Sequence, residues 1–92
     1  MTDQEKHQRL FVQLISMFHA AALQQMGKIK NPITDTIEKD LGQAGLTIDM
    51  LDMLKEKTKG NVSVEEEQKI KEIVAQLKNY FGAEKSKEQP KQ

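Results

Sequence analysis

The sequence contains no cysteine among its 92 residues. Disulfide bonds, catalytic thiolates and cysteine-ligated metals are therefore excluded, and we expect the protein to work in the reducing cytoplasm. The chain also lacks an excess of charge of either sign, because 14 Lys and Arg residues balance 14 Asp and Glu residues. Nucleic-acid binding and polybasic membrane contact both rely on an excess of positive charge. We expect neither nucleic acid nor membrane as a partner.

A long uninterrupted hydrophobic run is also missing. The most apolar region, Leu10 to Met26, is broken by the polar residues Gln13, Ser16, His19, Gln24 and Gln25. A membrane-spanning helix needs about 20 nearly continuous apolar residues, and this region does not qualify. The first residues are polar and charged rather than basic and then apolar, so they do not predict a signal peptide. A chain of this length is one domain with a modest core, and self-association is a common way to complete such a core.

The first helix is predicted from Thr2 to about Met26. Thr2 and Glu5 have the spacing of a capping box, and Gly27 is a suitable helix stop. The apolar residues follow helical spacing and, at about 100° per residue, cover roughly half of the helix circumference. One neighbouring helix cannot cover so wide an arc. We therefore expect this helix to have more than one apolar neighbour.

Residues 28–39 are predicted to connect this helix to the next. Asn31-Pro32 disfavours helix and favours a turn, and we expect Ile33 and Ile37 to anchor the connection to the core. Asp40 is a good N-cap for a second helix, although Gly42 and Gly45 leave a start at Thr47 as the alternative.

The second helix is predicted to end at Gly60-Asn61, which suits a left-handed cap. It carries two apolar stripes that are offset around its axis. The first comprises Leu41, Ala44, Ile48, Leu51 and Leu54, and the second comprises Leu46, Met50 and Met53. Like the first helix, it is too apolar for a single neighbour.

The third helix is predicted to begin at a second capping box, Ser63 to Glu66. Its narrow apolar stripe runs through Ile70, Ile73, Val74, Leu77 and Phe81, and Gly82 is the predicted stop. We therefore predict one helical domain over residues 1–82 and a mobile polar tail over residues 83–92.

Residues 47–61, TIDMLDMLKEKTKGN, are followed by Ser63 and by glutamates at 65–67. This stretch, with its "ID-x-L-x-x-L-x-x-KT-x-GN" pattern, resembles the small bacterial family catalogued as domain of unknown function 1844. The similarity extends back through Leu14 to Asn31-Pro32 and forward to about Phe81. The resemblance implies a small helical protein of the bacterial cytoplasm, and it transfers no catalytic or binding residue.

We predict no catalytic, cofactor-binding or metal-binding residues. His7 and His19 are about 18 Å apart along one helix, so only a symmetric partner could bring equivalent histidines to one metal. Asp49 and Asp52 share a helix face without the histidine that di-iron bundles use. Gly42 and Gly45 have the G-x-x-G spacing of RNA-clamping loops, but no strands flank them.

The predicted fold is all-α, with two long helices and one shorter helix in a bundle that self-association completes, a dimer being favoured. We expect a non-enzymatic homo-oligomeric interaction or structural module, with a further protein partner possible and no cofactor. The alternative is a carrier of a small apolar ligand or lipid, with a pocket between helices near the methionines. The predicted interface residues are Phe11, Leu14, Ile15, Phe18, Met50 and Met53, and Ile48, Leu51 and Leu54 would add to the intermolecular core.

Overall fold

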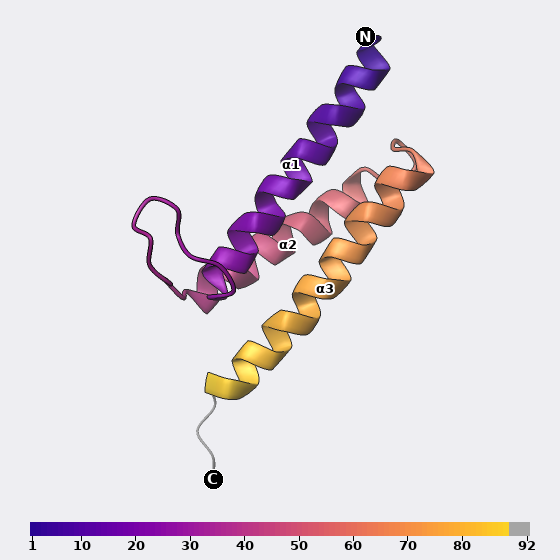
Figure 1. Cartoon of the computed structure of the whole chain (residues 1–92). Coiled ribbons are helices and arrows are strands. Elements are labelled where there is room, and N and C mark those ends of the chain that lie inside the picture. The colour runs from indigo at the N-terminus through magenta and orange to yellow at the C-terminus, as the bar shows by residue number, and fades with distance from the viewer. Residues whose placement is uncertain (89–92) are drawn as a thin grey trace.

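The computed structural model describes residues 1–88, which form three α-helices and no strand (Figure 1). The helices are α1 (Asp3–Gln25), α2 (Leu41–Lys57) and α3 (Val64–Glu88). The prediction of an all-α, three-helix fold is confirmed. Two helices are long and one is shorter, as predicted, but the expectation that the third helix is the shorter one is wrong, because α3 has 25 residues and α2 has 17.

Both predicted capping boxes are present. At the start of α1, the Thr2 hydroxyl accepts a hydrogen bond from the Glu5 N–H at 3.1 Å, and the Glu5 carboxylate accepts one from the Thr2 N–H at 3.0 Å. At the start of α3, Ser63 and Glu66 form the same reciprocal pair at 3.1 and 2.9 Å. Two of the unpaired N–H groups of each helix start are thereby satisfied.

Helix α2 begins at the earlier of the two predicted positions. The Asp40 carboxylate accepts a hydrogen bond from the Gln43 N–H at 3.1 Å, so the first turn is capped in spite of Gly42 and Gly45. Gly27 and Gly60, just beyond the ends of α1 and α2, have φ values of +78° and +84°. Glycine is the residue that adopts this left-handed conformation without a steric cost.

The prediction that α3 ends at Gly82 is wrong. The helix continues through Gly82 to Glu88, so residues 83–88 belong to the helix and not to a mobile tail. Its last turns are held because the Glu84 side chain is buried against lysines from the α1–α2 connection. Residues 89–92, the rest of the predicted tail, lie outside the described residues.

One core lies between the three helices. Its fully or nearly fully buried members are Ile15, Ala22 and Met26 of α1 and its end, Leu41, Ala44, Ile48 and Leu51 of α2, and Ile70, Ile73, Val74 and Leu77 of α3. The first predicted stripe of α2 and the predicted stripe of α3 therefore face this core. Phe11, Phe18, Leu54, Tyr80 and Phe81 are partly buried around it.

The molecule is elongated and thin, measuring 55 × 30 × 16 Å between Cα atoms. Its radius of gyration is 15.0 Å, whereas a compact chain of this length would have about 12 Å. Figure 1 shows that the N-terminal part of α1 extends past the turn between α2 and α3. Three helices in this arrangement leave one side of α1 and α2 without a neighbour.

The connection between α1 and α2 forms a loop that projects from the bundle (Figure 1). Ile33 is 91% exposed and Ile37 is 54% exposed. The expectation that both isoleucines anchor the loop to the core is wrong. The loop is held instead by an Asn31–Thr36 backbone bridge and by lysines at its base.

Candidate functional site

The most distinctive surface of the protein is an apolar face on α1 and α2. Its six members are large hydrophobic side chains that are 39–61% exposed: Leu10, Leu14 and Met17 on α1, and Leu46, Met50 and Met53 on α2. We call these six residues the α1/α2 face. By contrast, Val64, at the first position of α3, is the one large exposed hydrophobic residue of that helix among residues 64–88.

The α1 part of the face lies on the side of the helix away from α3. His19 marks the side near α3, because its Nε2 lies 2.8 Å from Oε1 of Gln76 on α3. At about 100° per residue, Leu10 and Met17 lie roughly opposite His19 around the axis of α1. Helix α3 therefore does not cover them.

The α2 part of the face has a similar orientation. Asp52 marks the side near α3, because Lys78 of α3 donates a hydrogen bond to its carboxylate at 2.9 Å. Met50 lies roughly opposite Asp52 at helical spacing. Thr47, one turn from Met50, lies at the junction with α1, where its hydroxyl donates to Oε1 of Gln25 at 2.7 Å. The exposed apolar stripes of both helices therefore face away from α3.

The structure divides the predicted interface residues into three groups. Leu14, Met50 and Met53 lie on the α1/α2 face, while Phe11 and Phe18 are half-buried at the edge of the core. Ile15 is completely buried within the single chain, so it cannot contact a partner in this structure. The same correction applies to two residues expected in an intermolecular core, Ile48 and Leu51, which are 4% and 0% exposed.

No methionine lines the three main hollows on the described part of the chain. Met26 is 1% exposed and belongs to the core, and Met50 and Met53 stand on the open face. Three hollows on the described surface, of about 770, 430 and 160 Å³, are lined by other residues. No observation on residues 1–88 favours the carrier hypothesis.

The largest of these hollows lies between the start of α1 and the turn that joins α2 to α3. It is an open groove with both polar and apolar surface, and it is lined by Gln4, His7, Gln8, Phe11, Thr58, Gly60, Asn61, Val62, Ser63 and Glu66. Residues 1–88 contain no group of three or more His, Asp or Glu side chains arranged to hold a metal ion. Two residues of the groove, Ser63 and Glu66, are already engaged in the reciprocal hydrogen bonds of the α3 capping box.

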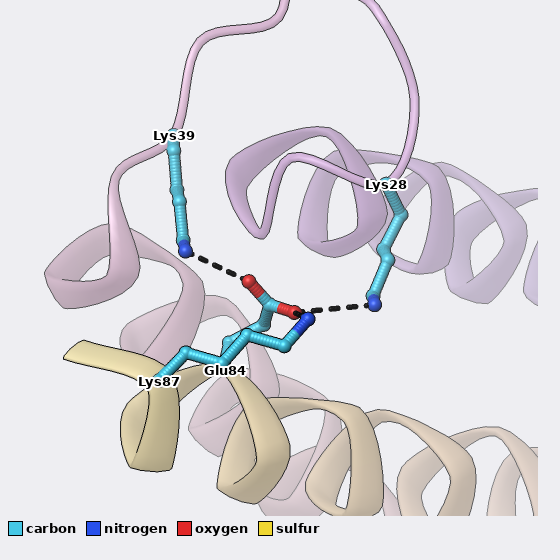
Figure 2. Close-up of polar contacts among 4 residues, drawn as sticks. All are labelled: Lys28, Lys39, Glu84 and Lys87. Carbon is cyan, nitrogen blue, oxygen red and sulfur yellow. Dashed lines mark hydrogen bonds and ion pairs between the residues drawn. The ribbon is translucent and has the colours of Figure 1, made fainter.

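A cluster of charged residues joins the α1–α2 loop to the end of α3 (Figure 2). The Glu84 carboxylate lies 2.8 Å from Nζ of Lys39, 3.0 Å from Nζ of Lys87 and 3.2 Å from Nζ of Lys28. Its side chain is only 7% exposed. Lys28 also lies over the ring of Tyr80, 5.2 Å from its centroid, which is the geometry of a cation–π contact.

These lysines favour the ionised form of Glu84. Hydrogen bonds from Lys39, then Lys87 and Lys28, lower the pKa of the Glu84 carboxyl from 4.5 to about 2. The same contact raises the pKa of Lys39. The Glu84 carboxylate is therefore ionised at neutral pH, and its contacts with Lys28 and Lys39 fix the base of the loop to α3.

Sequence reasoning missed this cluster, although a signal was present. Glu84 is seven residues after the core residue Leu77, and two helical turns bring both to the same face. Continuation of the stripe past Gly82 therefore predicts that residue 84 points inward. Its lysine partners, at positions 28 and 39, are too distant in sequence to be predicted from local spacing.

Comparison with known families assigns most of the chain to one domain family. The family model described as Domain of unknown function (DUF1844) matches residues 8–83. The chain belongs to this family. The match includes α2, the projecting loop and most of α1 and α3, so the α1/α2 face is part of the DUF1844 domain.

Neither the curated proteins nor the solved structures include a match to this chain. Within residues 1–88, none of the helices of this DUF1844 domain combines the length and the apolar character needed to cross a membrane.

Proposed function

We propose that this DUF1844 protein is a non-enzymatic interaction module that forms a homodimer through the α1/α2 face. The supporting observation is that two adjacent helices expose six large hydrophobic side chains on their sides away from α3. Isolated surface hydrophobic residues are common, but a contiguous patch of them marks an interaction surface.

The size of the face suits a dimer of this kind. The exposed fractions of its six side chains add up to about three fully exposed residues, or roughly 600 Å² at about 200 Å² each. A stable interface buries about 800 Å² per partner, and about 65% of a homodimer interface is apolar. The α1/α2 face thus supplies about the apolar area that such an interface requires.

A second copy of the chain is the partner that fits with the fewest assumptions. A two-fold dimer places the same patch of both copies in contact, and packing two helices from each copy gives an intermolecular four-helix arrangement. The protein is proposed to act in the bacterial cytoplasm, which is consistent with a chain that has no cysteine.

Light scattering on a gel-filtration column, over a range of protein concentrations, tests this proposal. We expect a mass of twice 10.5 kDa for the unmodified chain. Met17→Glu should produce a folded monomer, because Met17 is 61% exposed and the new charge would be buried in the dimer. Ser16→Glu is the matched control, since it adds the same charge one position away on the polar side of α1, and it should leave the dimer intact. A monomeric unmodified chain at every concentration would contradict the proposal.

A further inference from the structure

The projecting loop, residues 28–39, has three exposed isoleucines that the proposed α1/α2 contact does not use. Ile29 is 42% exposed, Ile33 is 91% exposed and Ile37 is 54% exposed. Ile33 is the most exposed large hydrophobic residue among residues 1–88. An apolar side chain so far from its own core suggests that another surface covers it.

The loop is ordered by its own hydrogen bonds. The Asn31 N–H donates to the Thr36 carbonyl at 2.8 Å, and the Asn31 side-chain oxygen accepts from the Ile33 N–H at 2.9 Å. Within the loop, the hydroxyls of Thr34 and Thr36 both donate to the Glu38 carboxylate. A loop that is already ordered loses little conformational entropy when it binds, which favours its use as a contact.

The base of the loop is attached to the rest of the protein at both ends. Lys28 and Lys39 both contact the buried Glu84 carboxylate of α3, as Figure 2 shows. The Asp40 N–H also donates to the Gln25 carbonyl at 2.8 Å, which holds the start of α2 beside the end of α1. The direction of the loop is therefore fixed relative to the helices.

That direction is toward the side on which the α1/α2 face is open. Figure 1 shows the loop on the side of α1 away from α3. Leu10 and Met17 point to the same side, because they lie opposite the His19–Gln76 contact with α3. A molecule that covers the α1/α2 face from this side would also approach the loop.

We propose that the loop contacts the second copy of the chain, with Ile33 buried against that copy. This inference rests on the proposed homodimer. The α1/α2 face alone supplies roughly 600 Å² of apolar area, which suits an interface of standard size. The three isoleucines expose the equivalent of about two more residues, or roughly 400 Å². Together the face and the loop would contribute about 1,000 Å² of apolar area per partner, which lies in the range of the larger interfaces of obligate homodimers.

Sedimentation equilibrium of three chains tests this inference: the unmodified protein, Ile33→Ser and the matched control Val64→Ser. Val64 is 81% exposed, but it lies at the start of α3 rather than on the loop. Both variants should retain the helical circular dichroism of the unmodified chain, because neither residue packs in the core. We expect Ile33→Ser to raise the dimer dissociation constant at least about tenfold and Val64→Ser to leave it unchanged.

The two proposals fail in different ways. If the unmodified chain is a dimer and Ile33→Ser binds as tightly as Val64→Ser, the loop is not part of the interface and the inference is wrong, while the homodimer stands. If both variants weaken the dimer equally, the loss is not specific to the loop and the inference is also wrong. If the unmodified chain is a monomer at all concentrations, the homodimer itself is refuted.

Discussion

Replacing Gly82 with alanine should stabilise the protein. Gly82 lies inside α3, and a Cβ atom added at this position would have no heavy atom within 4 Å beyond its own helix. Its φ is not in the left-handed region. Alanine is favoured over glycine by about 0.8–1.0 kcal/mol in a helix interior, and an open site adds no steric cost to offset this gain.

The expected gain is therefore close to 1 kcal/mol in the free energy of unfolding. For a chain of this size, that corresponds to a rise of about 4–8 °C in Tm. Urea unfolding and thermal melting, followed by circular dichroism at a fixed protein concentration, would measure both quantities. The fixed concentration is needed because dimer formation would itself stabilise the folded state.

Gly60→Ala is the matched control for this experiment. Gly60 also has no heavy atom within 4 Å of an added Cβ, but its φ is +84°. An alanine there is strained by about 1–2 kcal/mol, so this variant should lose stability. If Gly82→Ala instead lost stability to the same extent as Gly60→Ala, Gly82 would be a left-handed helix end. The continuation of α3 to Glu88 would then be wrong.

Three further changes test the core, a cap and the charged cluster. Leu51→Ala should lower the free energy of unfolding by about 2–5 kcal/mol in urea titrations, because Leu51 is 0% exposed; a smaller loss would place it outside the core. Ser63→Ala should cost about 0.5–2 kcal/mol in the same assay, whereas the exposed Ser86→Ala should not. Because folding lowers the pKa of Glu84 from 4.5 to about 2, its ion pairs stabilise the protein fully above pH 4.5 and are lost as the pH falls toward 2. Glu84→Gln should therefore lower the free energy of unfolding at neutral pH, and that free energy should fall less than in the unmodified chain as the pH is lowered. If the two chains lost stability with acid to the same extent, the ion pairs of Glu84 would not be responsible.

The sequence predicted the features that depend on neighbouring residues. The two capping boxes and the Asp40 N-cap each use a side chain and a backbone N–H three residues apart, so spacing alone identifies them. The core stripes of α2 and α3 were also predictable, since burial follows helical periodicity. The fold class follows from these local signals.

The features that sequence reasoning missed depend on contacts between distant residues. Glycine is a common helix stop, but α3 continues past Gly82, and its next turn carries Glu84 into contact with Lys28, 56 residues earlier in the chain. Ile33 was expected near the core because it is apolar, yet the loop's own hydrogen bonds hold it away from the helices. Composition cannot distinguish an apolar residue that anchors a loop from one that the loop presents outward.

The width of an apolar arc likewise does not say which part of it the chain covers by itself. The sequence showed that α1 is apolar around about half of its circumference, and it led to Ile15 and Leu14 being grouped as interface residues. In the structure, the same arc is divided: Ile15 is completely buried, and Leu14 is 40% exposed. This division follows from the position of α3, which lies on the His19 side of α1.

The separation of buried from exposed apolar residues also determines the side from which an apolar partner can approach. Beyond its first residue, the exposed positions of α3 are polar, charged or small, so an apolar partner gains nothing on that side. On the opposite side, the α1/α2 face and the projecting Ile33 are both exposed and apolar. A two-fold dimer that uses this side leaves the charged surface of each α3 facing outward into water. In the proposed homodimer, each chain would supply the polar α3 as an outer helix and contribute the apolar face of α1 and α2 to the shared interface.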